Sequence, residues 1–201
     1  MRTNPLLLGC DFGKVSVVEV LLKDPRVDVT LEDNWQRIPL WYASLGGKLE
    51  VVEWFIASGR DLGDIKSKKG KYDFNSYTAL EIARKENKTE VVSVLERFIA
   101  NPAQTRHERR VKLGILDALA AEVFALTVFL CEDLLHLKPA LASTTAASAA
   151  QALRFFTMAS KLPMELQMLL RHRAVGSMKQ NILRQDSEAA FKSVARILQL
   201  Q

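Results

Sequence analysis

The sequence predicts an all-α protein, a solenoid of helix pairs followed by a C-terminal helical bundle. One motif recurs three times within residues 4–100, and each copy holds apolar residues at helical spacing. Residues 101–201 show the same helical spacing without the alternation that is typical of strands. We therefore expect a repeat array over residues 1–100, in units of about 4–33, 34–66 and 67–100, and a C-terminal helical domain over residues 101–201.

The repeat is defined by landmarks that stay in register. The three copies of the motif occupy Asn4–Lys14, Ile38–Lys48 and Thr78–Lys88, and a Val-Val pair follows each. Pro5, Pro39 and Ala79 hold the same place in each copy, at spacings of 34 and 40 residues. The longer spacing inserts residues between units two and three. Because the landmarks on both sides stay aligned, the insertion must fall between Ile65 and Ser76 and lengthen that loop.

Each unit reads as two short antiparallel helices. Proline suits the first helical position, where its fixed φ is favourable and its missing N–H is not needed. Gly13, Gly47 and Asn87 follow the first helix, where a left-handed residue commonly ends a helix. The second helix carries one apolar face that a single unit cannot bury alone. We therefore expect five side chains to be buried between units: Leu21, Leu22, Phe55, Ile56 and Leu95.

These landmarks resemble the ankyrin repeat, most closely over Asp33–Ile56. The residues that keep the family pattern there are Asp33, Pro39, Leu40, Ala43, Gly47, Val51, Val52 and Ile56. Gln36, Ile38 and Trp41 depart from the family's Gly, Thr and His, so the usual Thr/His hydrogen-bond pair is absent from this unit. We expect apolar packing to hold that turn instead.

The resemblance implies a non-catalytic scaffold that binds a protein partner through a concave surface formed by turn tips and first helices. Carried over by position, the partner-binding residues are Asn34, Trp35, Arg37, Leu45, Phe74, Asn75, Tyr77, Lys85 and Glu86. Tyrosine and tryptophan are enriched where binding energy concentrates. Packing between neighbouring turns is the alternative role for Trp35 and Tyr77.

The first unit has no polar capping helix before it. Its first helix carries Leu6, Leu7 and Leu8, as an internal repeat would. Terminal repeats normally present a polar outer face. We therefore expect either a truncated array or a face that meets another molecule.

The second half predicts helices with identifiable ends. Residues 106–137 form one long helix or a broken pair, and an Ala-rich helix follows over residues 140–161. Pro163 begins another helix that ends near Gly176, and Asp186 caps the last one, Ser187–Leu200.

The segment Leu162-Pro163-Met164-Glu165-Leu166 resembles the L-P-x-E-L opening of the F-box, an adaptor that docks to cullin-type ubiquitin ligases. The later features of an F-box are missing. The alternative function is therefore a substrate-recruiting ligase adaptor, and the simpler interpretation is an amphipathic helix with Leu166, Leu169 and Leu170 in the core. We expect Leu162, Leu166 and Leu170 to be buried.

Charge does not favour a nucleic-acid partner. The chain carries 28 basic and 23 acidic residues, a net charge of +5 that lies in the second half, where the arginines are scattered rather than clustered. Four lysines occur within Lys66–Lys71, inside the inserted segment. They suit a solvated loop, or alternatively an import signal or a contact with an acidic partner.

The sequence contains no motif that is typical of a catalytic site. The three histidines stand on separate segments, and no phosphate-binding loop or nucleophile elbow is present. Cys10 and Cys131 suit packing and provide neither a disulfide framework nor a zinc site. We predict no enzyme activity, no cofactor, no metal and no small-molecule substrate. The absence of a secretory signal and of a membrane-spanning apolar run predicts an intracellular protein, cytoplasmic or nuclear.

Overall fold

A computed structural model describes residues 4–131, 154–159, 161–177, 179 and 181–199. The chain divides into two compact units, Met1–Leu113 and Gly114–Gln201, which we describe separately. The described residues are helical apart from one two-stranded hairpin, so the predicted all-α class is confirmed. None of the described helices is both long enough and apolar enough to cross a bilayer.

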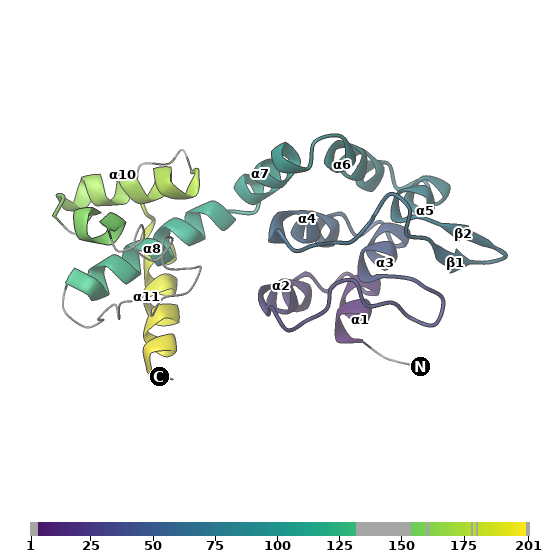
Figure 1. The fold of residues 1–201 in the computed structure, drawn as a ribbon, viewed down its shortest axis with the longest axis horizontal. Helices are drawn as coiled ribbons and strands as arrows, with labels where there is room; N and C mark the ends of the chain where they lie inside the picture. The colour runs from purple at the N-terminus through teal and green to yellow at the C-terminus, as the bar shows by residue number, and fades with distance from the viewer. Residues whose placement is uncertain (1–3, 132–153, 160, 178, 180, 200–201) are drawn as a thin grey trace. The chain divides into compact units, whose positions relative to one another are not determined.

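The first unit of the fold contains three stacked helix pairs (Figure 1). These are α1 (Pro5–Asp11) with α2 (Val15–Lys23), α3 (Pro39–Leu45) with α4 (Leu49–Ser58), and α5 (Ala79–Lys85) with α6 (Thr89–Ala100). Pro5, Pro39 and Ala79 are the first residues of α1, α3 and α5, as predicted. First helices stack on first helices and second on second, so each pair covers one side of the next.

The turn within each pair depends on one left-handed residue. Gly13, Gly47 and Asn87 have φ values of 66°, 63° and 56°, which confirms the predicted helix-ending role. This conformation is strained for most side chains and tolerated by glycine and asparagine. The recurrent Gly/Gly/Asn position therefore follows from backbone geometry.

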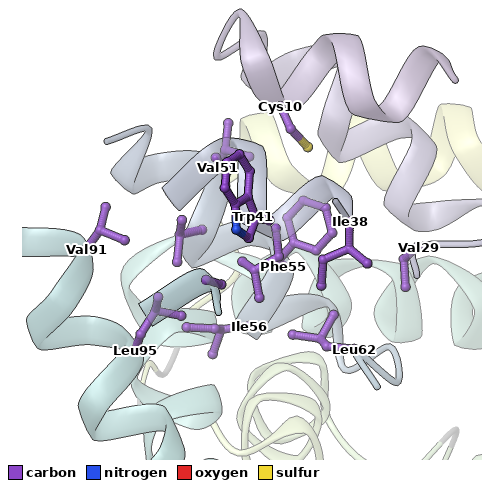
Figure 2. Packing of buried hydrophobic residues seen from close by; sticks show 14 of the residues in the cluster. Cys10, Val29, Ile38, Trp41, Val51, Phe55, Ile56, Leu62, Val91 and Leu95 are labelled. Atoms are coloured by element: carbon purple, nitrogen blue, oxygen red, sulfur yellow. The ribbon is translucent and has the colours of Figure 1, made fainter. Parts of the chain in front are cut away.

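The core lies between the stacked pairs, as Figure 2 shows for Trp41, Phe55 and Ile56. Leu22, Phe55, Ile56 and Leu95 are buried, as predicted. Leu21 is not: it is only half-buried, packed at the edge of the core. Among the described helices of the first unit of the fold, α1 packs on α3 and α2 on α4, and α2 buries only Val18 and Leu22, a narrower face than that of α4 or α6.

The inserted residues form a hairpin rather than an irregular loop. Strands β1 (Gly70–Tyr72) and β2 (Asn75–Tyr77) pair antiparallel, with Gly70 opposite Tyr77 and Tyr72 opposite Asn75. After the hairpin, Thr78 caps α5: its side chain accepts from the Glu81 amide, and the Glu81 carboxylate accepts from the Thr78 amide. The residues added between units two and three therefore extend the connection between them into a β-hairpin.

A seventh helix, α7 (Pro102–Lys112), belongs to the first unit of the fold. It packs on α4 and α6, and the Glu53 carboxylate accepts hydrogen bonds at 2.7 Å from Arg109 and from Lys112. The division of the chain therefore falls after Leu113, later than the boundary expected at residue 100. Gly114, with a φ of 70°, separates α7 from the next helix, so the segment expected as one helix or a broken pair is a broken pair.

In the second unit of the fold, α8 (Ile115–Cys131) contacts both α10 (Met164–Val175) and α11 (Arg184–Gln199). Residues 154–159 are also helical. Phe191 of α11 packs edge-on against Phe124 and Phe129 of α8. The last helix begins at Arg184, so the prediction that Asp186 caps it is wrong. Most of the predicted Ala-rich helix over 140–161, and the Cys131 side chain, lie outside the described residues.

The prediction that Leu162, Leu166 and Leu170 are buried is also wrong. Leu166 is 49% exposed, and the other two are half-buried. The buried side of α10 is polar instead, and the Arg171 guanidinium donates to the Thr127 hydroxyl of α8 at 3.2 Å. Apolar residues on several sides of α10 left its sequence without one defined core face.

Asp117 of α8 joins α10 to the segment that follows it. Its carboxylate accepts hydrogen bonds from the Ser177 hydroxyl at 2.9 Å and from the Lys179 ammonium at 2.6 Å. Buried His172 of α10 lies 4.0 Å from the same carboxylate. Desolvation acts to raise the pKa of Asp117, but the hydrogen bonds from Lys179 and Ser177 outweigh it and hold the pKa below its ordinary value.

Candidate protein-binding surface

The turn before α3 is held by a carboxylate. Asp33 accepts hydrogen bonds from the backbone amides of Trp35 at 2.8 Å and Arg37 at 2.9 Å, and from the Tyr42 hydroxyl at 2.7 Å. Burial, and then the hydrogen bond to Asp33, raise the pKa of Tyr42. The expectation that apolar packing holds this turn is therefore wrong. Asp33 supplies the acceptors that satisfy the turn's amides, and Gln36 takes the left-handed conformation, with a φ of 62°.

The hairpin before α5, in the third repeat, is hydrogen-bonded directly to this turn. The Lys71 amide donates to the Trp35 carbonyl at 2.8 Å, and the Arg37 Nε donates to the Lys71 carbonyl at 2.6 Å. A Cβ on Gly70 would lie 2.8 Å from the Arg37 Cγ and 3.2 Å from its Cα. Only glycine at this position lets the hairpin approach so closely.

Arg37 occupies the centre of an aromatic cluster. Its guanidinium carbon lies 5.0 Å from the Trp35 ring centroid and 4.9 Å from that of Trp41. Tyr42 and Tyr72 lie further out, at 5.8 and 6.0 Å. The buried Trp41 also donates its indole N–H to the Tyr77 carbonyl at 2.9 Å. These cation–π contacts, together with the hydrogen bond to Lys71, hold the Arg37 guanidinium against aromatic faces.

Lys85 continues the cluster along α5. Its ammonium lies 4.5 Å from the Tyr72 ring centroid and 4.9 Å from that of Tyr77, and it contacts the Asp73 carboxylate at 3.2 Å. Partial desolvation acts to lower the pKa of Lys85, but Asp73 and Tyr77 outweigh it and raise the pKa. Cations and aromatic rings thus alternate across two adjacent units. We call this set the cation–aromatic cluster: Trp35, Arg37, Trp41, Tyr42, Tyr72, Tyr77 and Lys85.

The structure brings together four of the nine predicted partner-binding residues, namely Trp35, Arg37, Tyr77 and Lys85, within this cluster. Phe74 is fully exposed at the hairpin turn, and Asn34 and Asn75 are exposed beside these residues in the chain. Leu45 and Glu86 are half-buried, and Leu45 packs against the core.

Sequence reasoning missed the parts played by Trp41, Tyr72 and Asp33. In the sequence, Trp41 stands out only as a replacement for the family's histidine. Tyr72 could have been found from strand alternation, because residues paired across a hairpin share a face and Tyr72 and Tyr77 both lie on the face that includes Gly70. Its contact with a lysine on α5 depends on the fold.

The lysines of the inserted segment are partly engaged within the protein. Lys68 forms an ion pair with Glu32, and Lys69 lies 3.8 Å from Glu81. Both lysines remain substantially exposed. Such exposed ion pairs contribute little to stability. The Lys68 and Lys69 side chains remain in contact with solvent.

The described residues contain no group of three or more His, Cys, Asp or Glu side chains that could hold a metal ion. Cys10 is buried in the core of the first unit, and burial raises the pKa of its thiol (Figure 2). A buried thiol of this kind is a packing group, because the reactive form is the thiolate.

Comparison with known proteins agrees with the fold of the first unit. The family model for ankyrin repeats matches residues 3–104 in three copies, just over half of the 201-residue chain. A solved structure of a predatory endopeptidase from Bdellovibrio bacteriovorus in complex with an immunity protein contains a chain that is 16% identical, with a TM-score of 0.40. The alignment covers 96% of this chain and 99% of that one, and a TM-score this low does not establish a shared fold. The family match, the three helix pairs and their left-handed turns together show that the chain belongs to the ankyrin-repeat family.

Proposed function

We propose that the chain is a non-catalytic scaffold that binds a protein partner through the turn tips and first helices of its second and third repeats. Ankyrin repeats are modules of protein–protein interaction, so the family match supports the binding of a protein partner in general. The observation that carries the proposal is the cation–aromatic cluster, in which side chains of two adjacent repeats contact one another.

The cluster has the properties of a binding surface that is ordered before the partner arrives. Arg37 and Lys85 are already held against aromatic faces, so less side-chain entropy is lost on association. Trp35 is 42% exposed and Phe74 is fully exposed, which leaves large apolar area for a partner to cover. The predicted contact set remains Asn34, Trp35, Arg37, Leu45, Phe74, Asn75, Tyr77, Lys85 and Glu86.

The experiment has two stages. Affinity purification with the full chain as bait first identifies a protein partner, and calorimetry then measures its affinity for Trp35→Ala. We expect the dissociation constant to rise about tenfold or more, as for a tryptophan at a binding hot spot. The melting temperature should stay nearly unchanged, because Trp35 lies outside the hydrophobic core of the repeats.

Leu183→Ala is the matched control, since Leu183 is comparably exposed at 49% and lies in the other unit of the fold. It should leave the affinity unchanged. If Trp35→Ala retained full affinity while lowering the melting temperature, Trp35 would be a packing residue between neighbouring turns and the proposal would fail at this residue.

The second candidate function is the ubiquitin-ligase adaptor, with the segment from Leu162 docking to the ligase. The exposure of Leu166 favours it, because a docking residue must be reachable in the free protein. The family match ends before this segment and gives it no support. Recovery of ligase subunits by the wild-type bait and their loss with Leu166→Asp would support the adaptor; recovery of partners without ligase subunits would reject it.

A further inference from the structure

A cleft bordered by α4, α6 and α7 lies apart from the proposed partner surface. Its volume is about 360 Å³, and all of its lining residues belong to the first unit of the fold. The three helices pack on one another, so the walls of the cleft are held by the fold (Figure 1). We call it the α4–α6–α7 cleft, and its side chains that can donate a hydrogen bond are those of Thr89, Ser93, Arg97, Arg109 and Lys112.

The charges that line the cleft have a positive balance. Three cations, Arg97, Arg109 and Lys112, face two carboxylates, Glu53 and Glu90. The Glu53 carboxylate is already compensated, because it accepts hydrogen bonds at 2.7 Å from Arg109 and from Lys112. Glu90 is exposed in the first turn of α6. An anion that enters the cleft therefore meets a net positive charge.

Arg109 has one guanidinium edge that Glu53 does not occupy. The residue is only 9% exposed, and its Nη1 donates to the Glu53 carboxylate at 2.7 Å. Its Nε–H has no hydrogen-bond acceptor among the residues that the structure describes. A buried donor without an acceptor is costly. The edge formed by Nε and Nη2 matches two oxygens of one oxyanion, so such a ligand would supply the missing acceptor.

The first turn of α6 adds donors from a second helix. Lys88, the residue before α6, forms no capping hydrogen bond with its side chain, so no side chain of this residue satisfies the first amides of the helix. Helix N-termini of this kind favour anions. The exposed Thr89 and Ser93 contribute hydroxyl groups to the cleft. Donors of α6 and α7 therefore meet at one place.

We propose that the α4–α6–α7 cleft binds a phosphate group. Arg109 donates to two phosphate oxygens along the edge that Glu53 leaves open, and Lys112, whose side chain is 54% exposed, turns toward a third. A tetrahedral phosphate accepts hydrogen bonds from several directions, whereas a carboxylate accepts them mainly near its own plane. The cleft shares no residue with the cation–aromatic cluster, so this site goes beyond the proposed protein-binding function.

An NMR titration of the full chain with inorganic phosphate at fixed ionic strength tests this proposal. We expect saturable shifts of the amide signals in the first turn of α6 and around Arg109, and none in α1 or α2. Acetate should bind at least about tenfold more weakly, because it accepts fewer charge-assisted hydrogen bonds. O-phosphoserine distinguishes the source of the group: tighter binding than phosphate identifies a phosphate ester, and equal or weaker binding identifies the free ion.

Two variants test the donors. Arg109→Lys keeps a positive charge beside Glu53 but removes the two-donor edge, and it should raise the dissociation constant for phosphate at least about tenfold. Lys112→Met should weaken binding to a similar extent. Lys23→Met is the matched control, since Lys23 is also an exposed lysine paired with a glutamate but lies on α2, and it should change nothing.

Circular dichroism checks that each variant is folded, and Lys112→Met still tests the site if Arg109→Lys is not. The proposal would be overturned if phosphate gave no saturable shifts, or if acetate bound as tightly as phosphate. Wild-type affinity for phosphate in the folded variants would overturn it as well.

Discussion

The burial of Phe55 depends on the stacking of the repeats. Its side chain is fully buried in the core of the first unit of the fold, between repeats that contribute to it from both sides. Phe55→Ala should lower the free energy of unfolding by about 3 to 5 kcal/mol, the usual cost of removing a buried phenylalanine ring. Urea unfolding followed by circular dichroism measures it.

Phe74→Ala is the control for that substitution, since the same ring is fully exposed at the hairpin turn. Its effect should stay within about 0.5 kcal/mol. A loss below about 1 kcal/mol at Phe55 would mean that the repeats are not stacked in this register.

Asp117 predicts a pH dependence of stability in the second unit of the fold. Its folded pKa is held below the ordinary 3.8, so its interactions contribute fully at higher pH and are lost as the pH falls through the folded pKa. Asp117→Asn should cost about 1 to 3 kcal/mol at neutral pH. The difference from wild type should shrink below pH 3.8.

Unfolding free energies at several pH values, taken from hydrogen exchange of the α8 amides, provide the measurement. Glu122→Gln serves as the control, because Glu122 is an exposed carboxylate on the same helix. A difference between wild type and Asp117→Asn that grew on acidification would contradict the assignment.

At the scale of elements, α7 is fastened to the repeats by a buried ion pair. The Glu53 and Arg109 side chains are 3% and 11% exposed, and removing one member of such a pair leaves the other charge buried without compensation. We expect Glu53→Ala to cost about 3 to 5 kcal/mol. Glu53→Leu combined with Arg109→Met should cost less, because neither charge remains.

Thermal unfolding of the three variants tests this order. The exposed pair between Arg84 and Glu96, at 2.6 Å, provides the comparison, and Glu96→Ala should cost less than about 1 kcal/mol. If the double variant were less stable than Glu53→Ala, this order would be contradicted. The Glu53–Arg109 ion pair would then contribute net stability of its own, beyond the cost of leaving one buried charge unpaired.

At the scale of the whole molecule, the position of α7 predicts where the chain can be divided. Residues 1–113 should fold by themselves, because α7 then covers α4 and α6 and compensates Glu53. Residues 1–100 should be less stable, since the same surface and the same carboxylate become exposed. Melting temperatures of the two fragments decide this, and equal stability would place the boundary at residue 100.

Much of the array could be predicted because its signals are local. A proline at the first helical position, a glycine or asparagine in the left-handed turn, and apolar residues at helical spacing each act within a few residues. Their repetition at spacings of 34 and 40 residues then predicted both the stacking and the place of the insertion. The same local signals placed the helix break before Gly176.

The candidate surface could be predicted only as a set of positions. The positions of Trp35, Arg37 and Tyr77 at the turn tips could be predicted. The contacts between their side chains and the rest of the cluster could not be predicted. The Arg37 contact with Lys71 joins residues 34 apart in sequence, and the hairpin that makes it possible was expected only as a longer loop. Contacts of this kind depend on how two repeats are aligned in space.

The sequence by itself therefore determined the fold class, the repeat register and the helix ends of the array, because backbone preference and apolar periodicity are properties of short segments. The tertiary structure alone decided that α7 joins the array, that α10 buries a polar side, and that cations and aromatic rings of two repeats form one cluster. Each of these depends on pairing distant segments, where hydrogen bonds and charges must find partners in three dimensions.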